Sequence, residues 1–334
     1  MPLQRAMNLT SKATYAIAAV MATALMAVPW PGLAQHNPTY PAKPIRIVTG
    51  AAGTQNDIVA RMLGAKMSEG FGQPVIIENR GGAGGAIGAN IVAKATPDGY
   101  TLLLQSGQFA IRAAVQTNLP YDSHRDFTGV TQVGFPTQVV LVSPNLGVKS
   151  VKEFIAHALA RPEPMLYGSA GPGSGTHMDA ERFRMAAGIK ARGIAFKGSY
   201  EAMIEVMAGR AHYVTAPLGP ALPLIRDGRM LALAVIAPRR SPLLPNVPAM
   251  AEVLPGYQRD GSYGLIAPAG TPRAILLTLA KEIKRILDLP DVKAQMQGMG
   301  FVPATSTPEE LDQIIRADIE AYTKVAKLIG LRAQ

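Results

Sequence analysis

The chain has 334 residues and a formal net charge of +10, yet its basic residues are scattered singly or in pairs such as Arg239-Arg240. Because no basic run is interleaved with aromatic residues, this charge does not predict a nucleic-acid-binding protein. The sequence contains no cysteine, which excludes disulfide bonds, so the hydrophobic core alone must stabilise the fold. A chain of this length usually forms two domains.

Residues 1–34 have the pattern of a secretory signal peptide. Arg5 and Lys12 are followed by the apolar stretch TYAIAAVMATALMAV and the helix-breaking PWPG, and Gly32 and Ala34 supply the small residues of a cleavage site. The apolar stretch is short for a membrane span, and no second run of spanning length follows it. We therefore expect export and cleavage after Ala34, with an uncleaved membrane anchor as the alternative.

The first part of the mature chain alternates strand and helix signals. Strands are predicted at 45–49, 74–78 and 101–104, and helices begin near Asn56 and after the loop 81–85. In the second helix, Ile87 and Ile91 are expected to face inward. The strand 101–104 is apolar on both faces, as a buried parallel strand would be. This β-α-β-α-β order predicts a doubly wound α/β domain.

A second alternating series occupies residues 139–236. Its predicted strands lie at 139–142, up to 167, 193–196, 212–215 and 231–236. Ser150 and Glu153 form a capping-box pattern that begins one of the helices between them. A further strand at 262–267 precedes two long helices, which begin at Thr271-Pro272 and Thr307-Pro308. Two α/β units in one exported chain predict a two-lobed receptor with a cleft between its lobes.

Several common catalytic and cofactor motifs are missing. Neither Ser169 nor Ser174 lies in a Gly-x-Ser-x-Gly context, and no P-loop motif occurs. The glycines of 81–88 lack the spacing of a dinucleotide fingerprint, so a tight turn with close helix–sheet packing explains them better. No two of the five histidines have metal-ligand spacing on one helix. We therefore expect no catalytic residues, no metal and no cofactor.

Three loops, by contrast, share a pattern that suits an anion. The loops 49–57, 169–177 and 196–199 each join a strand end to a helix start, and each contains glycine and hydroxyl side chains. Helix N-termini offer free N–H donors and the positive end of the helix dipole. The simpler interpretation is that Thr54, Thr176 and Ser199 only cap their helices. Three such loops in one cleft favour a carboxylate-binding site.

Long segments of the sequence resemble the Bug family, the periplasmic substrate-binding proteins of tripartite tricarboxylate transporters. These segments include GQPVIIENRGGAGGAIGANIVAKATPDGYTLLL, LYGSAGPGSGTHMDAERF, FKGSYEAMIEVMAGR and YGLIAPAGTPRAIL. The resemblance extends over essentially the whole mature chain. It implies a periplasmic-binding-protein fold of two doubly wound α/β lobes joined by two crossovers, near 135–142 and 261–266. Lobe 1 would comprise 35–138 and 264–334, and lobe 2 would comprise 139–263.

The family's first loop, Pro-Phe-x-x-Gly-Gly-x-x-Asp, is matched at Gly53 and Asp57, whereas Gly50 replaces the aromatic residue and Thr54 the second glycine. Ala216-Pro217 replaces an Asp-Asn pair found in many members, which argues against an amino-acid ligand and for a plain carboxylate. The residues expected at the ligand are Ala51, Ala52, Gly53, Thr54, Asp57, Ser106, Ser169, Ala170, Gly171, Ser174, Gly175, Thr176, His177, Lys197, Gly198, Ala216 and Pro217.

The resemblance thus implies a monomeric periplasmic solute receptor, not an enzyme. It would bind a small carboxylate in the cleft and deliver it to the inner-membrane permease subunits of its transporter. The residues leave two alternatives open: an α/β enzyme acting on an acidic small molecule in the same cleft, and a receptor domain for a signalling partner. Catalytic turnover would distinguish the enzyme from the receptor.

Overall fold

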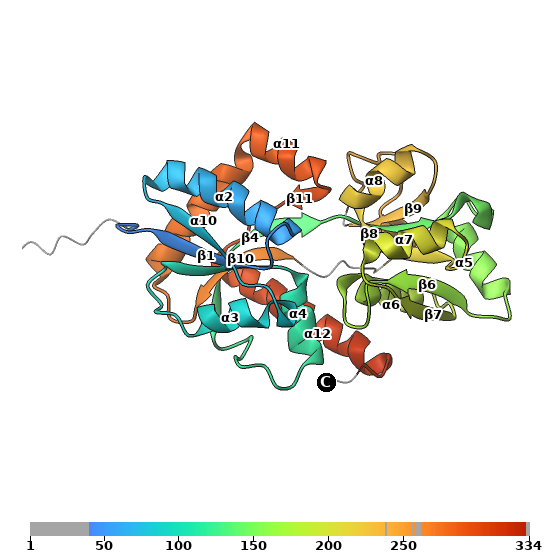
Figure 1. The fold of residues 1–334 in the computed structure, drawn as a ribbon, viewed down its shortest axis with the longest axis horizontal. Helices are drawn as coiled ribbons and strands as arrows, with labels where there is room; N and C mark the ends of the chain where they lie inside the picture. Colours follow the sequence, from blue (N-terminus) through green and yellow to red (C-terminus); the bar gives the residue numbers. More distant parts are fainter. Residues whose placement is uncertain (1–39, 238, 256, 258–261, 332–334) are drawn as a thin grey trace, which may run out of the picture. The chain divides into compact units, whose positions relative to one another are not determined.

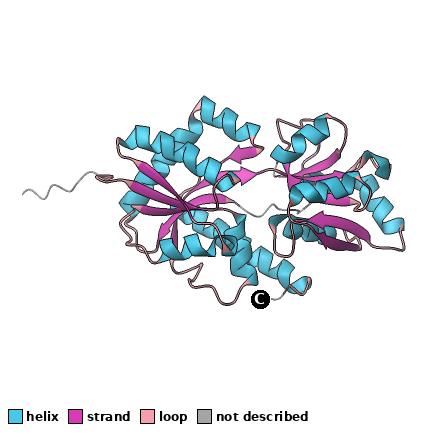
Figure 2. Cartoon of the chain, in the orientation of Figure 1, coloured by secondary structure: helices cyan, strands magenta, loops and turns pink. Residues whose placement is uncertain are grey.

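The computed structural model describes residues 40–237, 239–255, 257 and 262–331 (Figure 1). The expected signal peptide, and Gly261 at the start of the second expected crossover, lie outside the described residues. Strands and helices alternate along the chain and form two separate sheets, each with helices packed against it (Figure 2). In these ranges no helix is both long and apolar enough to cross a membrane.

The first sheet has six strands in the order β11-β4-β10-β3-β1-β2. Strands β1 (Ile45–Thr49), β2 (Val75–Asn79) and β3 (Thr101–Gln105) are parallel. Strand β10 (Tyr263–Pro268) runs antiparallel between β3 and β4 (Phe127–Pro136), and β11 (Phe301–Pro303) pairs antiparallel with β4. The carboxyl ends of β1 and β3 therefore meet at one edge, where ligands bind in open α/β sheets.

Helices cover both faces of this sheet. Helices α2 (Gln55–Phe71) and α10 (Arg273–Asp288) pack against each other on one face, and α4 (Gly107–Val115) and α12 (Pro308–Leu328) pack together on the other (Figure 1). The turn η2 (Ala83–Gly85), α3 (Ala86–Ala93) and α11 (Pro290–Gly298) complete this part. The predicted start of α12 at Thr307-Pro308 is confirmed, and a capping box fixes it: Thr307 Oγ accepts from Glu310 N, and Glu310 Oε2 accepts from Thr307 N.

The second sheet has five strands in the order β7-β6-β8-β5-β9. Strand β6 (Met165–Ser169) is parallel to β7 (Ala191–Ala195) and β8 (Tyr213–Pro217), whereas β5 (Gln138–Val142) runs antiparallel to β8 and β9 (Leu231–Ile236). The chain passes from one sheet to the other at Thr137, between β4 and β5.

The apolar residues of β5 explain why helices flank the second sheet on both sides. Val140 and Val142 face the core formed with α5 (Val151–Ala160) and α6 (Gly175–Ala186). Val139 and Leu141 face the core formed with α7 (Ser199–Met207) and α8 (Leu218–Arg226). Alternate residues of a strand point to opposite faces, so a strand apolar at every position is buried on both. The turn η3 (Pro144–Leu146) and α9 (Met250–Val253) complete this part.

The structure differs from the sequence-based prediction in some of its elements and in the orientation of one helix. Strand β4 and helices α4 and α11 were not predicted, although β4 lies inside the first sheet. Ile91 is half-buried and packs against the core, as predicted, whereas Ile87 is 49% exposed, so the prediction that it faces inward was wrong. The inner face of α3 is made of the smaller Ala86, Ala89 and Val92 because the helix lies close to the sheet.

Candidate ligand-binding site

A pocket of about 280 Å³ lies where the N-terminal ends of several helices meet, and we call it the helix-end pocket. The starts of α2, α4, α6 and α7 each contribute to it, so loops that follow strands of both sheets converge on one space. The lining comprises Gln55, Ser106, Gly107, Gln108, Ile111, Pro136, Gln138, Ala170, Ser174, Gly175, Thr176, Asp179, Ser199, Pro217, Tyr263 and Tyr322.

The loop before α6 is held by its own hydroxyl groups. Ser174 Oγ accepts from His177 N at 3.2 Å and donates to Gly171 O at 2.7 Å. Thr176 Oγ accepts from Ala170 N at 2.9 Å, and Thr176 O accepts from the hydroxyl of Thr215 at 2.7 Å. These side chains are committed to shaping the loop, so its backbone amides are the groups left to face a ligand.

Helix α6 offers those amides directly. Gly175 and Thr176 occupy its first turn, where N–H groups have no acceptor within the helix. Helix α4 is similar, because its N-cap Ser106 makes no side-chain hydrogen bond to the helix. The pocket lining contains neither lysine nor arginine, and its one carboxylate is Asp179, which is 6% exposed. An anion here would be held by N–H dipoles and neutral side chains.

The loop before α2 is held in shape by a charged side chain, the carboxylate of Asp57. Thr54 caps α2 through Asp57 N, and the buried Asp57 carboxylate accepts from Gly53 N at 2.9 Å and from Asn79 Nδ2 at 2.8 Å. Arg61 Nε lies 2.9 Å from the same carboxylate. The hydrogen bond from Gly53 N, followed by those from Asn79 and Arg61, lowers the pKa of Asp57 to about 2. Asp57 therefore stays ionised and stabilises the loop.

His177 occupies the corresponding place in the α6 loop. Its Nδ1 accepts from Gly173 N at 3.1 Å, and its ring stacks on Tyr167 at 6.2 Å between centroids. Burial lowers the pKa of His177, although the nearby Glu181 opposes this shift. The imidazole is therefore neutral at pH 7, with Nδ1 as the acceptor.

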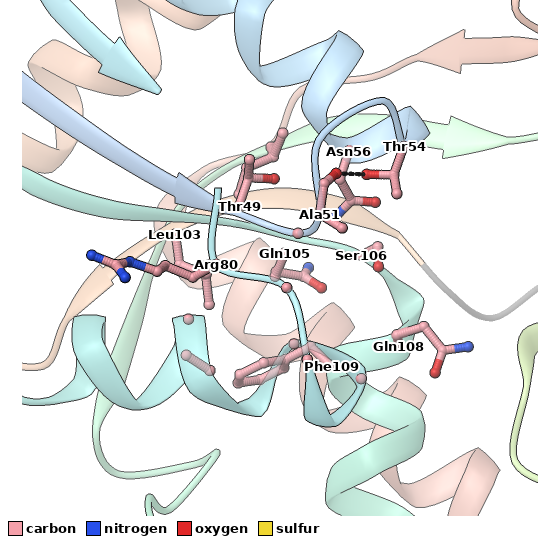
Figure 3. A pocket seen from close by; sticks show the side chains of 18 of the residues that line it. Thr49, Ala51, Thr54, Asn56, Arg80, Leu103, Gln105, Ser106, Gln108 and Phe109 are labelled. Atoms are coloured by element: carbon pink, nitrogen blue, oxygen red, sulfur yellow. Dashed lines mark hydrogen bonds between the residues drawn. The ribbon is translucent and has the colours of Figure 1, made fainter. Parts of the chain in front are cut away.

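A second space, the glycine-lined cavity, has a volume of about 250 Å³. It is bounded by the ends of β1 and β3, the loop before α2, the glycines that lead into α3 and the start of α4 (Figure 3). Ser106 and Gln108 line both the glycine-lined cavity and the helix-end pocket. The figure also shows the hydrogen bond from Thr54 Oγ to Ala51 O, 2.6 Å long, that closes the loop before α2.

The structure distributes the residues expected at the ligand over several places. The helix-end pocket is lined by Ser106, Ala170, Ser174, Gly175, Thr176 and Pro217. The glycine-lined cavity is lined by Ala51, Thr54 and again Ser106. Neither lining includes Ala52, Gly53, Asp57, Ser169, Gly171, His177, Lys197, Gly198 or Ala216. Of these, Gly53, Asp57 and His177 hold the loops in shape, Lys197 is exposed and Ala216 is fully buried.

Sequence reasoning missed several residues of the helix-end pocket. Gln108 was missed because α4 itself was not predicted, although a serine directly after a strand is a signal for a helix start. Asp179 is an acid on the helix that follows the predicted loop, and Gln138 and Tyr263 lie where β5 and β10 begin. Their positions depend on how strands far apart in sequence come together.

Comparison with known proteins identifies the class. Two α/β sheets with a pocket at their helix N-termini form the two-lobed fold of periplasmic solute-binding proteins, and this agrees with the solved structures that the chain matches. The family model described as "Tripartite tricarboxylate transporter family receptor" matches residues 59–331. The chain therefore belongs to this family, whose members are solute-binding receptors rather than enzymes, and the predicted family and fold class are confirmed.

Individual relatives match over most of the chain. Protein BugT of Bordetella pertussis is 32% identical over 298 residues, which cover 88% of this chain and 91% of BugT. An R. palustris protein solved with adipate is 30% identical, with a TM-score of 0.73, covering 88% of this chain and 100% of that one. MatC from Rhodopseudomonas palustris, solved with bound malate, is 29% identical, with a TM-score of 0.68, covering 86% of this chain and 99% of that one.

Proposed function

We propose that this receptor binds a small carboxylate in the helix-end pocket. The observation that carries the proposal is the convergence of the α4 and α6 N-termini on a pocket whose lining has no basic side chain. Backbone N–H groups and the positive ends of helix dipoles bind carboxylates without a paired cation. The relatives solved with adipate and malate support the same ligand class, because both compounds are dicarboxylates.

The proposed contacts are a subset of those expected from the sequence. The amides of Gly175 and Thr176 would hold the carboxylate, and Ser106, Ala170 and Pro217 would border it. The remaining expected residues would act indirectly, as Asp57 and His177 do through the loop hydrogen bonds. The replacement of the family's Asp-Asn pair by Ala216-Pro217 supports a plain carboxylate, since β8 then ends without an acidic side chain.

A thermal-shift screen of mono-, di- and tricarboxylates, with amino acids as controls, tests the ligand class. A ligand present at 100 times its Kd stabilises the folded protein by about 2.7 kcal/mol, which raises the Tm measurably. We expect a carboxylate to give the largest rise and amino acids none. A screen in which no carboxylate raises the Tm, or in which amino acids alone do, would refute the proposal.

We further propose where the receptor is located and how it takes part in transport. Residues 1–34 would direct export to the periplasm and be removed after Ala34, so mass spectrometry of the exported protein should find an N-terminus at Gln35. The mature monomer would comprise lobe 1 (35–138 and 264–334) and lobe 2 (139–263), and would deliver its ligand to the permease subunits of a tripartite transporter. Small-angle scattering should show a smaller radius of gyration with ligand, because two-lobed receptors close on binding by hinge motion.

A further inference from the structure

A buried carboxylate lies behind the loop before α6. Glu181, in the second turn of α6, is 6% exposed and lines neither the helix-end pocket nor the glycine-lined cavity. It accepts a hydrogen bond of 2.5 Å from the hydroxyl of Tyr167, and Nε and Nη2 of Arg184 each lie 2.8 Å from its Oε2. Apolar side chains of similar volume often stabilise a core as well as a buried ion pair does. A role in specifying the local structure therefore explains this carboxylate better than stability alone.

Tyr167 connects this carboxylate to the loop before α6. It is 1% exposed and belongs to β6, the strand that leads into the loop. Its ring stacks on the imidazole of His177, with the ring centroids 6.2 Å apart and the planes at 26°. His177 Nδ1 in turn accepts from Gly173 N at 3.1 Å. A continuous series of contacts thus runs from Glu181 to the backbone of the loop whose free amides face the helix-end pocket.

A glycine on the neighbouring strand leaves room for the Tyr167 ring. Gly193 of β7 pairs with Tyr167 of β6. A Cβ on Gly193 would lie 2.7 Å from the Tyr167 hydroxyl oxygen and 2.8 Å from Cζ, closer than side-chain carbons approach other atoms in folded proteins. Strand β7 is at the edge of its sheet, where an aromatic ring can cover a glycine of the adjacent strand. The ring therefore lies against the backbone of Gly193 with its hydroxyl directed at Glu181.

A second tyrosine of the same core provides a comparison. Tyr213 is fully buried, and its ring centroid lies 5.6 Å from that of Tyr167. Its hydroxyl, however, has no hydrogen-bond partner in the part of the chain that the structure describes. This core thus accommodates a tyrosine without supplying a charged partner for it. The partner of Tyr167 is a specific feature, and Tyr167 is the tyrosine that stacks on the residue holding the loop.

We propose that Glu181 is a positioning residue for the bound carboxylate. By fixing the Tyr167 hydroxyl, it holds the ring against which His177 packs, and so keeps the loop before α6 in the shape that presents its amides. This inference rests on the proposed function, because it concerns the same loop. Hydrogen bonds weaken as their distance and angle depart from the ideal, so groups that contact a ligand depend on the residues that support them.

Isothermal titration of the mature protein tests this, with the carboxylate that raises the Tm most in a screen that includes adipate and malate. Tyr167→Phe removes the hydroxyl but keeps the ring, and Glu181→Met removes the acceptor at similar volume. Each should weaken binding about three- to fivefold, the effect of one hydrogen bond. Glu181→Gln keeps an acceptor and should bind within about twofold of the parent. Gly193→Ala should weaken binding at least as much as Tyr167→Phe, because its methyl group displaces the whole ring.

Two variants serve as matched controls. Tyr213→Phe removes a hydroxyl without a partner among the described residues, so it should bind like the parent and unfold at an equal or higher Tm. Gly298→Ala adds a methyl group where no described atom lies within 4 Å, and it should change binding little. A double variant tests the route to the loop. His177→Asn removes the ring that stacks on Tyr167, so adding Tyr167→Phe to it should weaken binding no further.

The outcomes separate the two proposals. If Tyr167→Phe and Glu181→Met both bind like the parent, or if Glu181→Gln loses as much affinity as Glu181→Met, Glu181 does not position the loop through Tyr167. If the losses of Tyr167→Phe and His177→Asn add in the double variant, Tyr167 does not act through His177. Each of these results makes the inference wrong while the proposed function stands. If no carboxylate binds the parent at all, the proposed function is wrong and this inference falls with it.

Discussion

The loops before α2 and α6 have nearly the same internal hydrogen bonds but end in different side chains. Thr54 Oγ donates to Ala51 O as Ser174 Oγ donates to Gly171 O, and each hydroxyl also accepts an amide from the first turn of its helix. The glycine before each cap has a φ of +75° or +71° and donates its N–H to the residue four positions on. That residue is the anionic Asp57 in one loop and the neutral His177 in the other.

This difference decides which helix end is available to an anion. The Asp57 carboxylate already occupies the positive end of α2, and Arg61 holds it there. His177 accepts the corresponding hydrogen bond, from Gly173 N, with a neutral imidazole nitrogen. The loop before α6 therefore places no negative charge at the positive end of the α6 dipole. One loop geometry can therefore serve mainly for structure or mainly for binding, depending on a single charge.

The largest effect is expected from blocking the α6 loop. Gly175 corresponds to Gln55 of the α2 loop, and a Cβ on Gly175 would lie 3.8 Å from Gln108 Nε2 across the helix-end pocket. Gly175→Val places a branched side chain over the free amides and should weaken carboxylate binding at least a hundredfold in isothermal titration. Gln55→Val is the matched variant at the other loop and should cost less than tenfold. Equal losses for the two variants would mean that the loops do not differ in function.

Making the α6 loop resemble the α2 loop should give the next largest effect. His177→Asp keeps an acceptor for Gly173 N but places a carboxylate near the bound anion. A charge at a helix N-terminus is worth up to about 2 kcal/mol, so we expect a ten- to thirtyfold loss of affinity that shrinks at high salt. His177→Asn, which is neutral, should lose much less. If the aspartate and asparagine variants bind equally at low salt, charge does not distinguish the loops.

Acid should destabilise the two loops in different pH ranges. The folded-state pKa of His177 lies below its ordinary value of 6.5, so the unfolded chain binds the proton first and stability falls as the pH drops below about 6.5. The folded-state pKa of Asp57, about 2, lies below the ordinary 3.8, so its stabilisation persists above pH 3.8 and is lost between there and pH 2. Urea unfolding midpoints measured across this range check both windows.

Variants with neutral side chains show which loop causes each loss of stability. In a plot of the urea unfolding midpoint against pH, His177→Gln should reduce the fall just below pH 6.5, and Asp57→Asn should reduce the fall below pH 4. Profiles that keep the parent's shape in both variants would show that other groups dominate the acid response.

The smallest effects are expected from the capping hydroxyls. Ser174→Ala and Thr54→Ala each remove an N-cap and should lower the free energy of unfolding by about 1 kcal/mol in urea titrations. Because both hydroxyls point to their own loops, ligand affinity should stay within about threefold of the parent. A loss of more than tenfold for Ser174→Ala alone would mean that this hydroxyl contacts the ligand.

Most strands and helices were predictable because their signals are local. The apolar run of β5, the caps at Ser150 and Thr307 and the loops rich in glycine and hydroxyl residues all appear where they were expected. Strand β4 was not, because FTGVTQVGFP contains two glycines and no clear alternation. One of these glycines, Gly134, is required by the structure, because a Cβ at this position would lie 2.4 Å from Val302 O of the paired strand β11.

The sequence by itself determined the α/β class, the family and the loops that surround the helix-end pocket, because hydrophobic periodicity, capping residues and glycine spacing act over short stretches of chain. Only the tertiary structure decided which residues of those loops line a pocket. Asp57 and His177 fit the expected motifs, yet their side chains turn inward to hold the loops. Thr49 and Gln108 face a cavity because β1, β3 and α4 meet there. Which elements lie next to one another depends on strand order and register, and local sequence does not specify these.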